Sequence, residues 1–173
     1  MSATAAAPIE IDPEFDLFFY LELSSQTRLE NDLLGRLEQS WNRWRPMLRA
    51  YSLPSPAGQD KARLLLFLDQ AVEEEVEGLW QTSPSEAFAF HNLAIAMVMG
   101  AARQLVPELA MGGCAPLPRP DRETRKTFKK LGLVWSEEGA VNRSYAVFTP
   151  MPYIGGCEIC HMKSTCPKSA FRD

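Results

Sequence analysis

The sequence lacks the features that would place the chain in a membrane or in an export pathway. Its longest apolar stretch, residues 88–106, is interrupted by four polar residues and therefore predicts a buried helix, not a membrane span. The small-residue start, residues 2–7, has neither the basic region nor the apolar region of a signal peptide. We therefore expect a cytoplasmic protein that does not associate with membranes.

The sequence also lacks the common catalytic motifs. It has no glycine-rich phosphate loop, no Gly-x-Ser-x-Gly and no His-Glu-x-x-His. Its composition, 46% hydrophobic and 23% charged over 173 residues, is that of one ordinary globular domain. Without a visible nucleophile–base pair, the sequence favours an accessory or binding protein over an enzyme.

Cysteine is scarce, but three of the four cysteines lie in the short stretch GGCEICHMKSTCPK, residues 155–168. They have the spacing C-x2-C-x5-C, and the fourth cysteine lies far upstream. Thiols stay reduced in the cytoplasm, so metal ligation is favoured over disulfide bonding. Tetrahedral zinc and a cubane iron–sulfur cluster each need four ligands. The candidate ligands are Cys114, Cys157, Cys160 and Cys166.

The residues around the cysteines suggest how such a centre would be surrounded. A Gly-Gly pair precedes both Cys114 and Cys157, and glycine lets the backbone approach a bulky cluster, although each pair is also compatible with a plain turn. A histidine next to a ligand cysteine can tune the centre or replace a ligand, and aromatic rings can shield it from water. The candidates for this second layer are Gly113, Gly156, Tyr153 and His161.

Three kinds of centre compete for these thiols. Structural zinc usually uses paired two-cysteine knuckles, which a single knuckle and a distant cysteine match less well. Residues 157–161 match C-x-x-C-H, the haem-attachment signature, but haem would leave Cys114 and Cys166 unused. We therefore predict a [4Fe-4S] cluster, with zinc as the alternative cofactor.

The motif resembles segments of known iron–sulfur families. C-x2-C-x5-C followed by Pro167 resembles the cluster loop of endonuclease III and MutY glycosylases, although their first ligand position is Pro150 here. An upstream cysteine joined to a C-terminal triplet is similar to AddB and CRISPR-associated RecB-like exonucleases, but residues 115–156 contain no Glu-x-Lys. The size and the motif's C-terminal position are similar to NifQ, the molybdenum-donor protein of nitrogenase cofactor assembly, whose extra cysteine is Pro152 here. These resemblances imply cluster ligation by Cys114, Cys157, Cys160 and Cys166.

The charge is unevenly distributed along the chain. Residues 1–106 hold 8 basic and 15 acidic residues, whereas residues 107–173 hold 10 basic and 7 acidic residues. The basic excess is concentrated on a predicted helix over residues 121–131. It can serve as a solvated face, as a docking surface for an acidic protein or as a phosphate contact with nucleic acid. Its basic residues are Arg122, Arg125, Lys126, Lys129 and Lys130.

Apolar periodicity predicts a mainly α fold, a helical bundle of four to five helices with a small C-terminal lobe. We expect a helical body over 1–106, with helices over residues 15–23, 29–48 and 60–80 and a fourth opened by Ser83-Pro84-Ser85-Glu86. The lobe, residues 107–173, should contain the basic helix, a short β-hairpin of residues 133–135 and 144–148, and the cysteine loop. Body and lobe are expected to pack as one compact domain.

Together these features predict a cytoplasmic [4Fe-4S]-binding accessory protein. It would transfer electrons to a larger redox enzyme or assemble a metallocluster for it, and that enzyme would be its protein partner. One alternative is a nucleic-acid-binding or regulatory module with a structural or sensing cluster. The other is a helical adaptor stapled by zinc.

Overall fold

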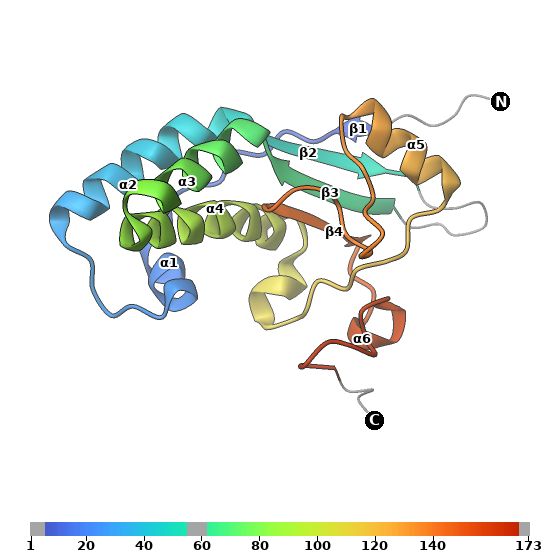
Figure 1. The fold of residues 1–173 in the computed structure, drawn as a ribbon. Helices are drawn as coiled ribbons and strands as arrows, with labels where there is room; N and C mark the ends of the chain where they lie inside the picture. The colour runs from blue at the N-terminus through green and yellow to red at the C-terminus, as the bar shows by residue number, and fades with distance from the viewer. Residues whose placement is uncertain (1–5, 55–61, 170–173) are drawn as a thin grey trace.

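A computed structural model describes residues 6–54 and 62–169, and it shows a mixed α/β fold built on one four-stranded antiparallel sheet (Figure 1). The strands lie in sequence order, β1-β2-β3-β4, and every neighbouring pair is antiparallel. On the central strand β3, Leu66 pairs with Ala50 of β2 on one side and with Val147 of β4 on the other. The strands are β1 (Ala7–Pro8), β2 (Leu48–Leu53), β3 (Ala62–Leu68) and β4 (Ala146–Met151).

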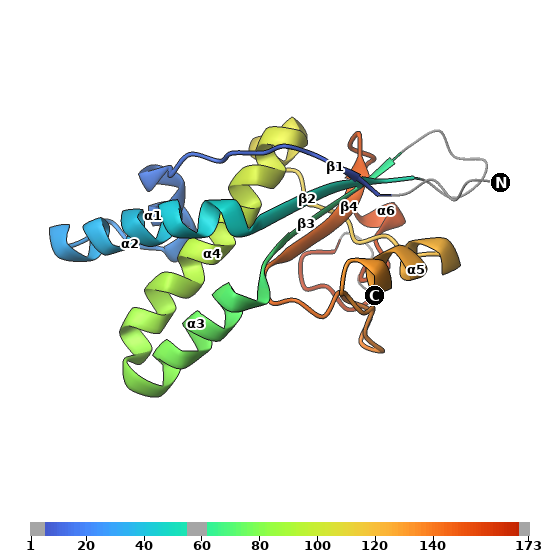
Figure 2. The ribbon, with the colours of Figure 1, turned by 90° about the horizontal axis from the view of Figure 1, so that it is seen from above.

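Helices cover both faces of this sheet (Figure 2). The first four α-helices pack on one face and α5 packs on the other, while α6 follows β4 in the chain. None of the described helices is long and apolar enough to cross a membrane. The helices are α1 (Leu17–Ser24), α2 (Asn31–Trp44), α3 (Gln70–Thr82), α4 (Pro84–Leu105), α5 (Arg122–Lys130) and α6 (Gly156–Ile159), with 3-10 turns η1 (Arg45–Met47) and η2 (Pro107–Met111).

The β3 strand is buried on both faces and divides the interior into two cores. Leu64, Leu66 and Leu68 are fully buried in the larger core, against α1–α4. Leu65 and Phe67 point the other way into a smaller core, which contains residues of α5 and β4. Successive side chains of a strand alternate between the two faces of a sheet, so a strand covered on both faces needs an unbroken apolar run.

The predicted mainly α fold is therefore wrong, and β3 is the principal reason. Residues 64–68 were expected to begin a long helix over 60–80, but they form a strand, and the helix α3 begins only at Gln70. A short apolar run is compatible with either a buried strand or a buried helix. The side chain of Asp69 accepts a hydrogen bond from Ala71 N at 3.0 Å and so caps α3. The expected cap, Asp60, lies outside the described residues.

The helix predicted after Ser83 is confirmed, since α4 spans Pro84–Leu105 and is the longest of the described helices. Ser83 occupies the N-cap position with Pro84 at the first helical position, but its side chain makes no capping hydrogen bond. Glu86 pairs with Arg36 of α2 instead. On the buried face, the hydroxyl of Tyr20 donates to the carbonyl oxygen of Ala89 at 3.0 Å and joins α1 to α4.

The predicted C-terminal hairpin forms differently from the expectation. Trp135 pairs with Val141 in an isolated bridge, so the expected pairing of residues 133–135 with residues 144–148 does not form. Residues 146–151 pair with β3 as strand β4. A strand added to an existing sheet gains a full ladder of backbone hydrogen bonds and an apolar face to cover, which an isolated two-stranded hairpin lacks.

Candidate metal centre

The structure brings the upstream cysteine loop against the C-terminal cysteine segment. The backbone N–H of Leu117 donates to Sγ of Cys160 at 3.4 Å, and the N–H of His161 donates to the carbonyl oxygen of Leu117 at 2.9 Å. The carbonyl oxygen of Pro116 accepts a hydrogen bond from the buried Thr149 hydroxyl on β4 at 3.0 Å. Residues 116–117 are therefore fixed between β4 and the C-terminal cysteines, although they are distant in sequence.

Tyr153 lies near both glycines that directly precede Cys114 and Cys157. A β-carbon built on Gly113 would lie 3.4 Å from the Tyr153 hydroxyl oxygen, and one built on Gly156 would lie 4.0 Å from the same oxygen. The two glycines are followed by Cys114 and Cys157. One phenol thus contacts both Gly-Gly-Cys segments, a juxtaposition that the sequence alone did not indicate.

Gly113 is needed where it stands because its backbone is closely packed. A β-carbon there would lie 2.7 Å from the carbonyl oxygen of Glu108, well inside van der Waals contact. That same oxygen accepts a hydrogen bond from Gly113 N at 3.1 Å, which closes η2, and Gly112 before it has a positive φ of 87°. Glycine relieves both constraints, so the pair turns the chain out of η2 directly into Cys114.

The three C-terminal cysteines lie close enough to Cys114 to raise the pKa of its thiol. Burial raises the pKa of the Cys114 thiol, and the charges of Cys160, Cys166 and Cys157 raise it further, while Lys168 lowers it. Cys114 is exposed and the other three are half-buried. A thiolate is disfavoured beside other thiolates unless a cation neutralises them, so such a group is suited to a metal centre. Within residues 6–54 and 62–169, however, the side chains as they stand form no group of three or more His, Cys, Asp or Glu that could hold a metal ion.

Tight turns bring the C-terminal cysteines near one another. Cys160 N donates to the carbonyl oxygen of Cys157 at 3.2 Å at the end of α6, and Cys166 N donates to that of Met162 at 2.9 Å. The two turns fold residues 157–166 back on themselves. The C-x2-C-x5-C spacing thus corresponds to two successive turns.

His161 connects the cysteine segment to the turn formed by residues 135–141. Its Nε2–H donates to the carbonyl oxygen of Gly139 at 2.7 Å, and its ring lies 5.8 Å from the ring of Trp135 between centroids. Trp135 in turn packs against Phe128 and Phe148 of the smaller core. The role predicted for His161 in tuning a metal centre stays a prediction. Its contacts with Gly139 and Trp135 attach the cysteine segment to the turn of residues 135–141.

The predicted basic helix is present as α5, and its cationic side chains face outward. Asp121 caps it by accepting from Thr124 N at 2.7 Å, while Thr124 and Phe128 are buried. The Thr124 hydroxyl accepts from buried Arg63 on β3 at 3.1 Å. Lys126 pairs with Glu123 at 2.7 Å. The exposed set is Arg122, Arg125, Lys126, Lys129 and Lys130.

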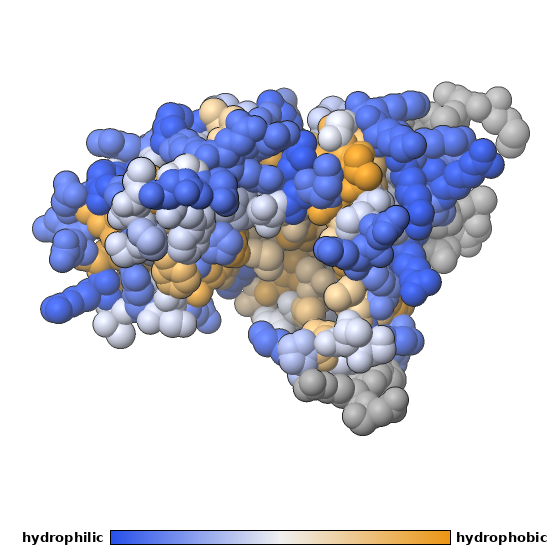
Figure 3. All heavy atoms as spheres, viewed as in Figure 1, coloured by the Kyte–Doolittle hydropathy of each residue, from blue (hydrophilic) through white to orange (hydrophobic). Residues whose placement is uncertain are grey.

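Exposed apolar side chains lie close to the cysteines in the chain, a feature that the sequence analysis did not single out. Met111 is 80% exposed, and Ile159 and Met162 are each 38% exposed. They stand three residues before Cys114 and on either side of Cys160, and we call them the apolar rim. Figure 3 shows a recess with hydrophobic surface between the helical layer and the C-terminal segment. Ile159 and Met162 were visible in the sequence as apolar residues among polar ones, whereas Met111 follows an apolar segment.

Comparison with known proteins adds no family to this description. No protein-family model matches the chain, and no curated protein or solved structure is significantly similar to it.

Proposed function

We propose that this chain is a [4Fe-4S]-binding accessory protein that passes electrons to a larger redox enzyme or supplies a metallocluster to it. The observation that carries the proposal is the contact between the Cys114 loop and the C-terminal cysteines through Leu117 and Cys160. It brings the loop that carries Cys114 against the segment that carries the other three cysteines, which supports a shared centre.

The donor set fits an iron–sulfur cluster. Cys114, Cys157, Cys160 and Cys166 offer four soft thiolates, the ligands such clusters prefer. The Leu117 N–H that already points at Cys160 Sγ is the kind of hydrogen bond that tunes a cluster's reduction potential. When bound, the cluster would supply one-electron chemistry or a transferable metal centre.

The surroundings favour exchange with a partner over a sealed structural role. Cys114 is exposed, and the apolar rim of Met111, Ile159 and Met162 adds exposed hydrophobic side chains close to the cysteines in the chain. A partner that covered this rim would exclude water from the centre and shorten the path for an electron. The cationic face of α5 offers a second contact, to an acidic protein surface.

Metal analysis of anaerobically purified protein tests the cluster. We expect about four irons and about four acid-labile sulfides per chain, and a paramagnetic signal after one-electron reduction. Cys114→Ser and Cys160→Ser should each lower the iron content. Met111→Ser, which changes an exposed sulfur-containing side chain close to Cys114, is the matched control and should load normally.

Two results would overturn the cluster assignment. One is a colourless protein with a single zinc per chain, which would establish the zinc-stapled adaptor. The other is full iron and sulfide content in Cys114→Ser, which would remove the remote cysteine from the centre. The accessory role would fail separately if the loaded cluster could be neither reduced, oxidised nor transferred to an apo-ferredoxin.

Nucleic-acid binding is the second candidate, and the outward-facing cations of α5 favour it. Binding of this kind weakens steeply as salt is raised, because phosphate contacts release counterions. Fluorescence anisotropy with labelled duplex DNA and single-stranded RNA at low salt tests it. Binding abolished by joint replacement of Arg122, Arg125, Lys126 and Lys129 with glutamine would support it, and its absence at low salt would exclude it.

A further inference from the structure

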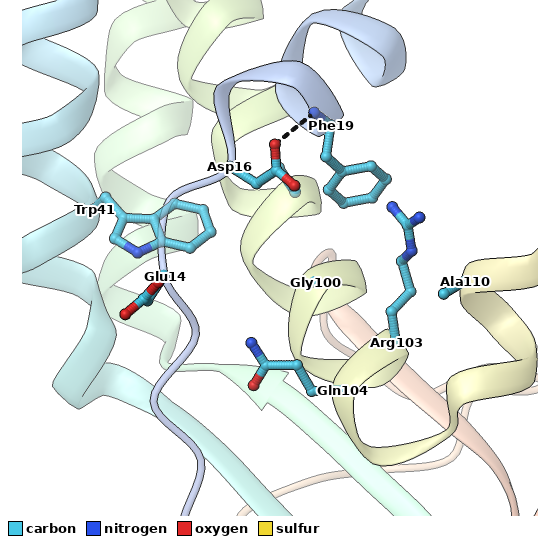
Figure 4. Close-up of a pocket in the computed structure, with 9 residues that line it drawn as sticks. Glu14, Asp16, Phe19, Trp41, Gly100, Arg103, Gln104 and Ala110 are labelled. Atoms are coloured by element: carbon cyan, nitrogen blue, oxygen red, sulfur yellow. Dashed lines mark hydrogen bonds between the residues drawn. The ribbon is translucent and has the colours of Figure 1, made fainter.

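A pocket with a cavity volume of about 270 Å³ lies between residues 14–19 and α4 (Figure 4). Trp41 of α2 forms one wall, and Ala110 of η2 closes the other end. The pocket contains none of the cysteines. Its lining is a mixture of charge and aromatic surface, which is the composition of many small-ligand sites.

Opposite charges line this pocket without pairing. The guanidinium of Arg103 lies 4.2 Å from the centre of the Phe19 ring, and within the described chain it makes no hydrogen bond or ion pair. Glu14 likewise has no partner among the described residues. Figure 4 shows Arg103 on one side of the pocket and Glu14 on the other, with Gly100 between them. The phenyl ring holds the guanidinium in place by a cation–π contact while leaving its N–H groups free.

A third charge lies at the top of the pocket. Asp16 caps α1 by accepting from Phe19 N at 3.0 Å with one carboxylate oxygen, Oδ1. Its second oxygen makes no bond within the described residues. The amide of Gln104 adds a neutral donor and acceptor next to Arg103 on α4.

Small residues make the space. Gly100 and Ala96 are one helical turn apart on α4, and Arg103 and Gln104 follow Gly100 by three and four residues on the same face. A β-carbon on Gly100 would meet nothing within 4 Å, so packing within the chain does not require glycine there. Glycine inside a helix costs about 1 kcal/mol relative to alanine, and here Gly100 lines the pocket.

We propose that this pocket binds a free α-amino acid as its zwitterion. Arg103 would receive the carboxylate through its paired N–H groups, and Glu14 with Asp16 would receive the ammonium group. A simple anion would face two carboxylates, and a simple cation would face the guanidinium. Only a ligand carrying both charges satisfies both sides.

The test is titration of the ¹⁵N-labelled full chain with each of the proteinogenic amino acids, followed by NMR. At least one should give saturable shifts at Gly100 and Gln104. For that amino acid, the amide lacking the carboxylate charge and the acid lacking the amino group should each bind at least about tenfold more weakly, about 1.4 kcal/mol. Arg103→Gln and Glu14→Gln should each weaken binding by a similar factor, and Gly100→Leu should block it.

Arg28→Gln removes an exposed guanidinium that makes no hydrogen bond or ion pair among the described residues, and it is the matched control that should bind normally. Glu14 is exposed and unpaired, so Glu14→Gln should fold even if the α4 variants do not. The proposal is overturned if no amino acid saturates below about 10 mM. It is equally overturned if the amide or the acid without an amino group binds as well as the amino acid itself, since the pocket would then be a plain amine or anion site.

Discussion

The imidazole of His161 occupies the space where residue 139 would carry a β-carbon. Its Cε1 would lie 2.4 Å from a β-carbon built on Gly139, whose carbonyl oxygen accepts the histidine's Nε2–H at 2.7 Å. Gly139 also has a positive φ of 84°. The imidazole of His161, the residue after a candidate ligand, therefore packs directly on Gly139, and a larger residue at position 139 would have to displace it.

We expect Gly139→Ala to displace His161 and to destabilise the C-terminal lobe by about 1–3 kcal/mol, measured by chemical denaturation. Gly132→Ala is the matched control, because Gly132 has a similar φ of 74° but open space around it. The difference between the two variants isolates the clash. If His161→Ala does not reduce the cost of Gly139→Ala, the clash is not its cause.

Gly113→Ala should impair the candidate metal centre more than it impairs the fold. The new β-carbon would collide with the Glu108 carbonyl oxygen, so the chain must leave η2 differently and Cys114 must move. We expect a lower iron content per chain. Gly155→Ala meets nothing within 4 Å and precedes Cys157 by two residues, so equal iron loss in both variants would contradict this explanation.

Leu66→Ala should test the position of β3. Leu66 is fully buried in the larger core. Truncating such a side chain to alanine typically lowers the free energy of unfolding by about 2–5 kcal/mol, and we expect a loss near the middle of that range. Val134→Ala, at a residue that is 51% exposed, should change the free energy of unfolding little. A cost for Leu66→Ala no larger than for Val134→Ala would place residue 66 outside the core.

Alkaline pH should destabilise the protein through two buried tyrosines. Burial raises the pKa of Tyr20 to about 12 and, together with the charges of Glu73 and Glu77, that of Tyr145 to about 12. An unfolded tyrosine ionises near pH 10, so the unfolded state loses protons first. The stabilisation is complete below pH 10 and is lost as pH rises from about 10 to about 12.

The magnitude of this effect is roughly 2–3 kcal/mol for each tyrosine, because one pKa unit corresponds to about 1.4 kcal/mol. Denaturant titrations at several pH values, compared with Tyr20→Phe and Tyr145→Phe, measure it. Each variant should have a flatter dependence on pH than the parent. Unchanged slopes would show that these hydroxyls ionise as they do in the unfolded chain.

The sequence predicted local features well where one kind of periodicity acted alone. Residues 37, 41 and 44 of the predicted stripe are buried on α2, but Leu48 of that stripe begins β2 because Pro46 ends the helix. The basic helix was predicted with nearly its observed bounds, since Asp121 and Gly132 mark its ends.

The sheet could not be predicted in the same way. The apolar run of β3 has no period, because both faces of the strand are covered, and β4 gained its partner from a strand some 80 residues earlier in the chain. The contact of Leu117 with Cys160 also depends on β4, since Thr149 holds the loop. The cysteines were visible in the sequence, whereas the approach of the two segments that carry them depends on the tertiary fold.

Leu117 and Cys160 touch across 43 residues, an interval that contains all of α5 and β4. A metal centre shared by Cys114 and the triplet would act as a cross-link over this interval, and most of its benefit would come from restricting the unfolded chain. The rate at which proteases cleave the smaller core would then depend on whether the protein carries iron. The apo protein should be cut first between α5 and β4, and the loaded protein should resist there.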